Sequence, residues 1–367
     1  QFHYSIEQTL NNISRSDTPK GFIVASPSRF DPPYYYHWVR DAALTMRAVD
    51  KTLSWEKKLP LFKDYVTLER SHQQTYTLTG LGEPKFNTDG SGYTDDWCRP
   101  QNDGPALRAV TMILFANQML ERGEENYVLD YLYAPQLPAN TVIKTDLEYT
   151  SHHWRETDCD LWEETRGKHF YTRMAQRQAM ILGSKLAERL NDPEAAGWYA
   201  KIAKEIEHEL ENHWSNEKQY ILTTLDRSTT EGLMTKETNL DASVVLAVLH
   251  SEVPGRSFDI NDERINHTGE GTAIGRYPED SYYGGNPWFL LTNGFAEYFY
   301  KLSKAKGNQN DLNELAESFI SRSRAHADPS GQMDEQFDRN NGYMKSAQHL
   351  TWSYASFMTM YLQRQET

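Results

Sequence analysis

The sequence has little cysteine and no long apolar segment. Only Cys98 and Cys159 occur among 367 residues, so the fold does not depend on a disulfide framework. No apolar run approaches the roughly 18 residues that a membrane-spanning helix needs. The first residues, Gln1-Phe2-His3, lack the layout of a signal peptide, so either none is needed or it has been removed.

Positive charge is also scarce. The 38 Lys and Arg residues face 52 Asp and Glu residues, and the net charge of −14 argues against nucleic acid or an anionic membrane as a partner. Aromatic residues are abundant, with nine Trp, 22 Tyr and 14 Phe, and they predict a sizeable core. Aromatic faces together with carboxylates suit a neutral, hydroxyl-rich ligand such as a sugar.

The motifs of several other chemistries are missing. The segment Gly80-Leu81-Gly82 lacks both the third glycine and the preceding strand of a dinucleotide-binding fingerprint. No glycine-flanked serine elbow occurs. The twelve histidines are scattered without an HExxH pair, and the two cysteines are 61 positions apart, so we expect no metal site.

Helical periodicity recurs along the whole chain. Helices are expected over residues 4–13, from about 41 to 49, and over 59–77, 106–120, 140–153, 170–190, 194–214, 240–250, 287–303, 311–325 and 349–364. Residues 218–225 are the only convincing strand material. No Pro/Ser-rich linker divides the chain, so we predict one all-α domain over residues 1–367, built as a ring of helix pairs whose long loops gather at one end.

Five segments between or beside these helices combine charged and aromatic residues: 34–41, 80–104, 157–170, 275–288 and 331–356. Any one of them is more simply explained as a loop with a helix cap and a packed aromatic residue. Five such segments on one helical scaffold indicate a functional site.

The segment 160-DLWEE-164 is the most suggestive of them. Glycosidic hydrolysis needs a carboxylic acid that stays protonated near neutral pH, beside an aromatic face for a sugar ring. An apolar wall such as Trp162 and like charges such as Asp160 and Glu164 raise the pKa of a neighbouring carboxyl group. The competing interpretation is that Glu163 and Glu164 are solvated residues on a helix face.

The chain resembles the glucoamylase family, glycoside hydrolase family 15. The resemblance is carried, in the family's order, by YYYHWVRDAALT (34–45), LGEPKFNTDG (81–90), WCRPQNDGPALRA (97–109), DLWEE (160–164), GRYPED (275–280), NPWFL (286–290) and LTWSY (350–354). It spans residues 21–362 and implies an (α/α)6 barrel of six inner and six outer helices, with a pocket at one end. It also implies inverting, exo-acting hydrolysis of α-glucosides without a metal or an organic cofactor.

Carried over motif by motif, the resemblance assigns the general acid to Glu163 and the general base to Glu335. It assigns Arg40 and Asp41 to the grip on the terminal glucose. The remaining substrate-binding residues that it implies are Tyr34, Trp38, Trp97, Leu161, Trp162, Glu164, Arg276, Tyr282 and Trp288. Lys85, Arg99 and Asp103 lie in matching motifs, although Asp103 has the alternative role of capping the helix that follows it.

The resemblance therefore implies a glucoamylase that releases β-D-glucose from the non-reducing ends of starch, dextrins and malto-oligosaccharides, acting as a secreted monomer. The alternatives are the same fold acting on isomalto-oligosaccharides, dextran or trehalose, an inactive sugar-binding toroid, or an intracellular location. No starch-binding module is recognised, which favours soluble dextrins over raw granules.

Four positions near the site depart from the family pattern. Cys98 and Cys159 replace a usual glycine and a usual aromatic residue beside the site tryptophans, and they form either a disulfide or two buried free thiols. His37 and Val39 replace small polar residues around Trp38, which could alter the outer pocket.

Overall fold

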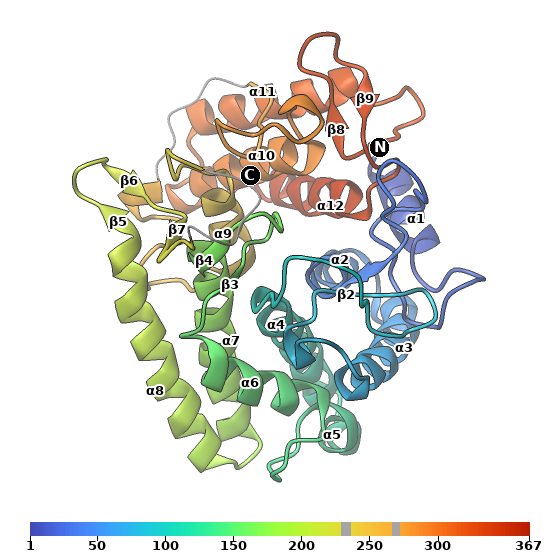
Figure 1. Cartoon of the computed structure of the whole chain (residues 1–367), viewed down its shortest axis with the longest axis vertical. Coiled ribbons are helices and arrows are strands. Elements are labelled where there is room, and N and C mark those ends of the chain that lie inside the picture. The colour runs from blue at the N-terminus through green and yellow to red at the C-terminus, as the bar shows by residue number, and fades with distance from the viewer. Residues whose placement is uncertain (229–235, 266–271) are drawn as a thin grey trace.

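The computed structural model describes residues 1–228, 236–265 and 272–367. Within these residues six α-helices form a closed ring in which each helix packs against the next (Figure 1). In ring order they are α2 (Val39–Thr52), α4 (Asp103–Glu121), α7 (Phe170–Arg189), α9 (Ser243–Ser251), α10 (Phe289–Ala305) and α12 (Thr351–Gln365). Their side chains are buried on most faces because each helix packs against ring neighbours and most also pack against an outer helix.

A second layer of helices surrounds this ring (Figure 1). Its members in the described residues are α1 (Phe2–Asn11), α3 (Trp55–Gln74), α6 (Val142–His153), α8 (Pro193–Leu210) and α11 (Asn310–His326). In α8, Ile202, Ile206 and Leu210 recur every four residues and are buried against α7, as the amphipathic pattern predicts. The alternation of inner and outer helices confirms the predicted (α/α)6 barrel, and the expected helices start and end within a few residues of the observed ones.

One outer position differs from the expected six. The connection from α9 to α10 contains, in its described residues, only the short 3-10 turns Glu263–Ile265 and Tyr282–Gly284. Its sequence explains the difference, because the segment 252-EVPGRSFDIND-262 combines proline and glycine with aspartates that bind their own backbone. A three-residue helix, α5 (Glu125–Tyr127), continues into a π-turn over Val128–Leu132 between α4 and α6.

The strands are short, and two of the five pairings in the described residues join segments that are distant in sequence. They are β1 (His37–Trp38) with β2 (Lys85–Phe86), β3 (Asp158–Cys159) with β4 (Arg166–His169) and β7 (Thr224–Leu225), β5 (Trp214–Ser215) with β6 (Tyr220–Ile221), and β8 (Gln336–Phe337) with β9 (Met344–Lys345), all antiparallel. The predicted strand over 218–225 contains β6 and β7. The other strands were not predicted, because two-residue pairings between loops leave no periodicity in the sequence.

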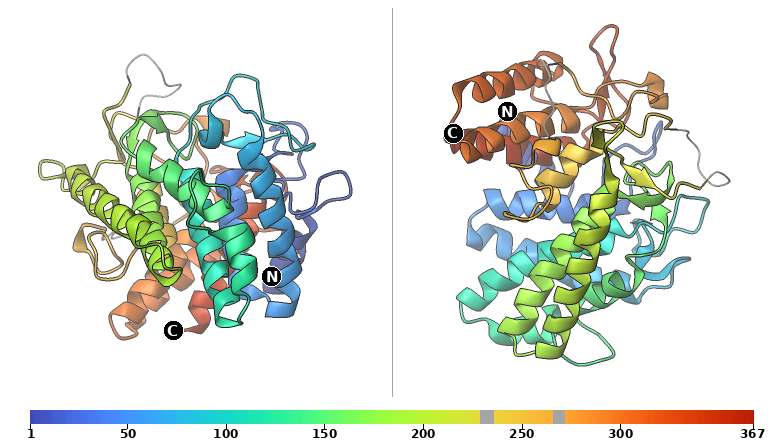
Figure 2. Two further views of the ribbon diagram at one scale, coloured as in Figure 1. Left: turned by 90° about the horizontal axis from the view of Figure 1, so that it is seen from below. Right: turned by 90° about the vertical axis from the view of Figure 1, so that its left-hand side faces the viewer.

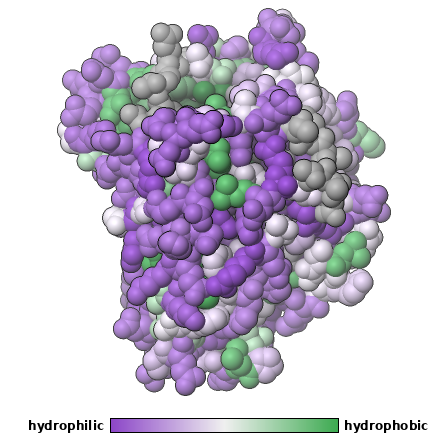
Figure 3. Space-filling model, turned by 60° about the vertical axis from the view of Figure 1, so that its left-hand side comes forward, coloured by the Kyte–Doolittle hydropathy of each residue, from purple (hydrophilic) through white to green (hydrophobic). Residues whose placement is uncertain are grey.

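The long loops gather at one end of the ring (Figure 2). There β1 pairs with β2 in the register Trp38 opposite Lys85, which joins the 34–41 segment to the 80–104 segment. The face in Figure 3 is mostly hydrophilic, with apolar residues in small separate groups. No helix in the described part of the chain is long and apolar enough to cross a membrane.

Candidate active site

A pocket of about 460 Å³ lies among the loops at this end of the ring. Every residue that the resemblance assigned to catalysis or sugar binding lines it: Tyr34, Trp38, Arg40, Asp41, Trp97, Leu161, Trp162, Glu163, Glu164, Arg276, Tyr282, Trp288 and Glu335. The structure adds the aromatic residues Tyr36, Tyr93 and Trp352, which lie in three of the five singled-out segments but were not themselves assigned. The five segments are therefore brought together around one cavity.

Three less firmly assigned residues have different positions. Lys85 lines the pocket, whereas Arg99 and Asp103 lie outside its lining. Arg99 pairs through Nε with Glu83 at 3.0 Å. Asp103 is the first residue of α4 and makes no side-chain cap; its Oδ2 instead accepts a hydrogen bond from Arg40 Nη1 at 3.0 Å.

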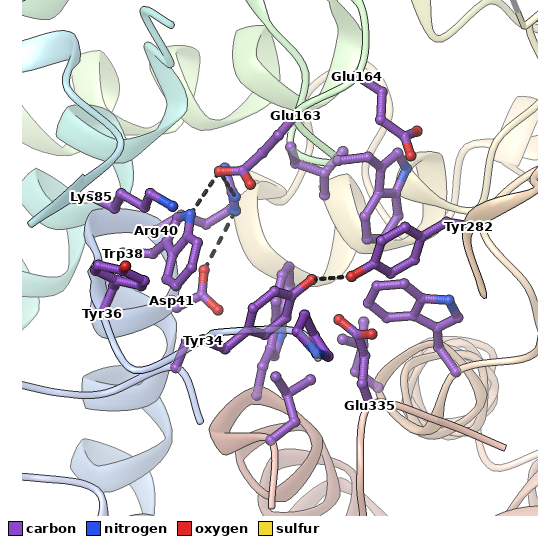
Figure 4. Close-up of a pocket in the computed structure, with 18 of the residues that line it drawn as sticks. Tyr34, Tyr36, Trp38, Arg40, Asp41, Lys85, Glu163, Glu164, Tyr282 and Glu335 are labelled. Atoms are coloured by element: carbon purple, nitrogen blue, oxygen red, sulfur yellow. Dashed lines mark hydrogen bonds and ion pairs between the residues drawn. The ribbon is translucent and has the colours of Figure 1, made fainter. Parts of the chain in front are cut away.

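Glu163 lies on the wall formed by the loop that follows β3. Its Oε1 accepts a hydrogen bond from Trp38 Nε1 at 2.7 Å, and Arg40 Nη2 lies 3.8 Å away (Figure 4). The same oxygen accepts a second hydrogen bond from Gln101 Nε2 at 3.0 Å. The backbone of Glu163 has a φ of 66°, a left-handed conformation that is uncommon for a residue with a side chain. Such strain persists only where the surroundings hold it, and it is frequent at functional sites.

Asp160 holds this strained turn. Its Oδ1 accepts hydrogen bonds from the amides of Glu164 at 2.8 Å and Thr165 at 2.9 Å. Its Oδ2 lies 2.7 Å from the ammonium of Lys236, and this partner helps to lower the pKa of Asp160 to about 2 although burial opposes the shift. The sequence predicts Asp160 as a like charge near a carboxyl group; in the structure Lys236, which the sequence did not single out, compensates the charge of Asp160.

Glu335 lies across the pocket from Glu163, with the hydrogen-bonded hydroxyls of Tyr34 and Tyr282, 2.8 Å apart, drawn between them (Figure 4). It directly precedes β8 and is 1% exposed. Burial raises the pKa of Glu335 to about 7, although hydrogen bonds from Ser346 Oγ and from Gln336 Nε2, the latter at 2.9 Å, favour its ionised form. The two carboxyl groups thus have different surroundings, since Glu163 is bound by an indole, an amide and a guanidinium.

Arg40 and Asp41 lie in the first turn of α2, where the strand β1 leads into the helix. Arg40 Nη1 donates to Gln101 Oε1 at 2.9 Å as well as to Asp103, and Asp41 Oδ2 lies 3.8 Å from Arg40 Nε. Burial raises the pKa of Asp41 to about 6, and the charges of Glu163 and Asp103 act in the same direction. The guanidinium is held in place by these bonds and contributes to the pocket lining.

A second arginine is held on the opposite wall. Arg276 Nη2 lies 2.8 Å from Glu164 Oε1, and the guanidinium forms two further hydrogen bonds with Asp280, at 2.7 and 2.8 Å. It also lies 5.2 Å from the ring centroid of Trp288. Tyr277 donates to the other oxygen of Glu164 at 2.6 Å, so this carboxylate is fully occupied by protein partners.

Lys85 is surrounded by aromatic rings on the remaining side of the pocket. Its Nζ lies 3.2 Å from the ring centroid of Trp97, 4.0 Å from that of Tyr93, 4.6 Å from that of Tyr36 and 4.7 Å from that of Trp38. Burial lowers the pKa of this lysine to about 8, although Glu163 opposes the shift. The cage presents stacking faces and an N–H donor to a neutral ligand.

The alternatives left open for the two cysteines are resolved by the structure. Cys98 and Cys159 form a disulfide with a Cα–Cα distance of 5.8 Å. It joins the loop that carries Trp97 to the loop that carries Glu163. The carbonyl of Cys98 also accepts a hydrogen bond from Gln101 Nε2, which contacts Glu163, so the bridge is close to the carboxyl group.

The one His/Glu cluster in the described residues that brings three possible metal ligands together is His37, Glu69 and His72. His37 Nδ1 accepts a hydrogen bond from the amide of Ile23 at 3.0 Å, so a neutral His37 carries its proton on Nε2, which lies 2.8 Å from Glu69. Arg108 also contacts Glu69. A cation would need the lone pair that this proton occupies, and the cluster is better described as a buried hydrogen-bond network.

A toroid of helices with two carboxyl groups lining an aromatic pocket is the arrangement that a glycoside hydrolase needs. The chain belongs to the glycosyl hydrolases family 15, whose family model matches residues 4–312 and 297–362.

Similar proteins agree with this assignment. The chain is 36% identical to "Glucoamylase 1" of Rhizopus oryzae, with 95% of this chain and 68% of that protein aligned. It is 34% identical to "Probable glucoamylase" of Schizosaccharomyces pombe, over 97% of this chain and 88% of that protein. The solved family 15 glucoamylase of Hypocrea jecorina superimposes with a TM-score of 0.90 at 27% identity, covering 100% of this chain and 71% of that one.

Proposed function

We propose that the protein is a glucoamylase, a glucan 1,4-α-glucosidase that releases single β-D-glucose units from the non-reducing ends of starch-type chains, with slower action at α-1,6 bonds. The observation that carries the proposal is the placement of Glu163 and Glu335 on opposite sides of one aromatic pocket (Figure 4). The glucoamylase names of its relatives support the same substrate class.

Glu163 is the general acid in this proposal. Protonation of the glycosidic oxygen assists departure of the remaining chain, and a positioned acid of this kind contributes about 10²- to 10⁴-fold in rate. The indole N–H of Trp38 and the amide of Gln101 both donate to Oε1 of Glu163. With Oε1 occupied, Oε2 is the oxygen that faces the leaving group.

Glu335 is the general base. Inverting enzymes hold their two carboxyl groups roughly 6.5–9.5 Å apart, which leaves room for a water on the face of the sugar opposite the leaving group. Glu335 must be ionised to take a proton from this water, and the donors Ser346 and Gln336 stabilise that ionised form. Attack from this face inverts the anomeric carbon and yields β-glucose.

The remaining pocket residues bind and orient the sugar. Arg40 and Asp41 offer a donor and an acceptor to hydroxyl groups of the terminal glucose, and Arg276 offers a second donor from the facing wall. Their bonds to protein partners fix their positions before the substrate arrives. They therefore contribute to the rate by orienting the substrate. Trp97 and the other rings around Lys85 provide stacking faces for the next glucose unit.

The same proposal covers organisation and location. Residues 1–367 act as one catalytic domain and as a monomer, and the net charge of −14 suits a neutral glucan and not a polyanionic partner. The disulfide between Cys98 and Cys159 favours an oxidising compartment, so we place the enzyme outside the cell.

A proton NMR time course of maltotetraose tests the reaction. The expected first products are β-glucose and maltotriose, and Glu163→Gln and Glu335→Gln should each abolish most of the turnover while binding of maltose persists. Early α-glucose would contradict inversion, and early maltose would contradict exo attack on single glucose units. Turnover only of isomaltose or trehalose in parallel tubes would retain the fold and site but change the substrate.

A further inference from the structure

Lys236 is a buried lysine beneath the loop that carries Glu163. It is 2% exposed and does not line the pocket. Its Nζ lies 2.7 Å from Asp160 Oδ2, 3.1 Å from Asp241 Oδ2 and 3.9 Å from Glu164 Oε2, and 4.1 Å from the ring centroid of Tyr277. No other lysine or arginine is recorded within 4 Å of Asp160 or Asp241 in the described residues.

Each carboxylate around Lys236 holds a different part of the Glu163 loop. Asp160 accepts hydrogen bonds from the backbone amides of Glu164 and Thr165 and thereby closes the turn in which Glu163 has its positive φ. Asp241 accepts the indole N–H of Trp162 through both oxygens, at 2.9 and 3.0 Å. These are the backbone and the neighbouring side chain of the proposed acid.

The charge balance beneath the loop depends on this one cation. Asp160 is 3% exposed and Asp241 is 5% exposed, so two carboxylates face each other across Lys236 away from water. Glu164 has its own cation, Arg276, but the other two do not. Removing one partner of a buried charge pair leaves the other uncompensated. Without Lys236 the two carboxylates would repel each other, and one of them would take up a proton or the loop would move.

We propose that Lys236 is a positioning residue for the glycosidase reaction, which holds Glu163 in its proton-donating position and sets its charge environment through Asp160 and Asp241. The inference rests on the proposed role of Glu163. Lys236 does not contact Glu163 and does not itself line the pocket, so it acts through the turn and through Trp162.

Two substrates separate this role from a structural one. Maltose needs protonation of its leaving oxygen, whereas α-glucosyl fluoride releases fluoride without an acid. With Lys236→Met, we expect kcat for maltose to fall roughly 10- to 100-fold, because a misplaced catalytic group costs on that order. The rate on α-glucosyl fluoride should fall less than about 3-fold, because it does not need the acid.

Lys144 supplies a matched control. It is also 2% exposed and pairs with Asp192 at 2.8 Å and with Glu148 at 3.5 Å, but it lies on α6 outside the pocket lining. Lys144→Met should destabilise the fold to a similar degree and leave both rates unchanged. The proposal would be overturned if Lys236→Met lowered the rates on both substrates equally, or if it left both rates unchanged as Lys144→Met is expected to do.

The pH profile gives a readout that does not depend on the folding yield of Lys236→Met. The titratable and charged groups that face Glu163 from other elements are Tyr34, Arg40, Asp41 and Lys85, and these stay unchanged in both variants described here. Loss of the Lys236 charge makes the potential at the site more negative, so the basic limb of kcat for maltose should move to higher pH. Asp241→Asn removes a negative charge and retains an oxygen for Trp162, so it should move the same limb to lower pH.

These results distinguish the inference from the proposed function. If the wild-type protein hydrolyses no α-glucoside, the proposed function fails on that result alone. If the wild type hydrolyses maltose but Asp241→Asn leaves the basic limb in place or moves it upward, the role of Lys236 is wrong while the function stands.

Discussion

Glu335 is buried in surroundings that favour its neutral form, although its proposed role requires ionisation. Its unfolded pKa lies near 4.5, and burial raises the folded value to about 7. A carboxyl group with a raised pKa stabilises the fold fully below its unfolded pKa and loses that contribution as the pH rises through its folded pKa. The proposed catalytic base therefore costs stability at neutral pH, as strained functional groups often do.

This cost gives a prediction at the scale of one residue. Glu335→Gln should raise the free energy of unfolding at pH 8 by roughly 1–3 kcal/mol, because a pKa unit corresponds to about 1.4 kcal/mol. The amide can still accept the hydrogen bond from Ser346, so at pH 4 the two proteins should unfold alike. Thermal unfolding at both pH values measures the difference, and an equal effect at pH 4 and pH 8 would contradict it.

Ser346 supplies a second prediction at this scale. Its hydroxyl donates to Glu335 and favours the ionised base, so Ser346→Ala should raise the pKa of Glu335 further. The acid limb of kcat/KM should then move up by about one pH unit, the value of one hydrogen bond to a charged group. Ser91→Ala, at an exposed serine bonded to Asp89, is the control and should leave the limb in place. A downward shift of the limb would contradict the role of Ser346.

At the scale of elements, contacts between segments that are distant in sequence hold the loops of the site together. The pairing of β1 with β2 and the disulfide between Cys98 and Cys159 connect three of the five segments around the pocket. The bridge spans a sequence separation of 61 residues, and in the loop-entropy view it removes much of the freedom of the unfolded chain.

Removing this bridge should therefore destabilise the protein strongly. For Cys98→Ser combined with Cys159→Ser, the free energy of unfolding should fall by up to about 4 kcal/mol, the loop-closure value for a loop of this length. Guanidinium unfolding with and without reductant measures it. The wild type should move toward the double variant on reduction, and the double variant should not respond. A wild type unaffected by complete reduction would contradict the stabilising role.

One helix of the ring, α9, is expected to open locally more readily than α4 or α7. α9 has nine residues, and the described part of the connection to α10 places no α-helix behind it. Fewer packed neighbours lower the free energy of local opening. We expect the amides of α9 to exchange hydrogen faster than those of α4 or α7, measured by mass spectrometry of peptic peptides. Protection of α9 equal to that of α7 would show that the irregular segment over 252–265 replaces a helix fully.

At the scale of the whole molecule, the buried ionisable groups have opposite effects on the stability of the fold as the pH changes. The pKa of Glu69 is well below 4.5, although burial opposes this, because His37 and Arg108 contact it, and the pKa of Asp160 is about 2. Such groups stabilise the fold above their unfolded pKa, and this stability is lost as the pH falls through the folded value. Asp41, with a pKa of about 6, and Glu335 act in the opposite direction.

The balance predicts a stability maximum in mild acid. Above about pH 6 to 7 the buried Asp41 and Glu335 ionise at a cost. Below about pH 4 the stability contributed by the lowered pKa values of Glu69 and Asp160 is progressively lost. The melting temperature should therefore be highest between about pH 4.5 and 6, as measured by calorimetry in buffers of constant ionic strength. A melting temperature that rises steadily from pH 5 to pH 8 would contradict this balance.

Much of this molecule could be predicted from the sequence because the signals were local. The period of apolar residues located the helices of both layers, and the mixed aromatic and charged loops identified the segments that form the pocket. Residues such as Trp38 and Glu163 could be assigned from the resemblance because they lie within contiguous motifs.

The residues that could not be predicted from the sequence have partners that lie far away along the chain. Lys236 lies 76 positions from Asp160, and Gln101 lies 62 positions from Glu163. Neither belongs to a periodic pattern that predicts its partner. The same is true of the pairings of β1 with β2 and of β4 with β7, which depend on where the helices bring the loops.

The helical architecture and the composition of the pocket follow from the amino-acid sequence, because periodicity, turn chemistry and motif order are local properties of the chain. The electrostatics of the site and the state of the cysteines depend on the folded structure. Charge compensation, burial and the 5.8 Å separation of Cys98 and Cys159 depend on through-space distances, and these exist only once the ring has closed.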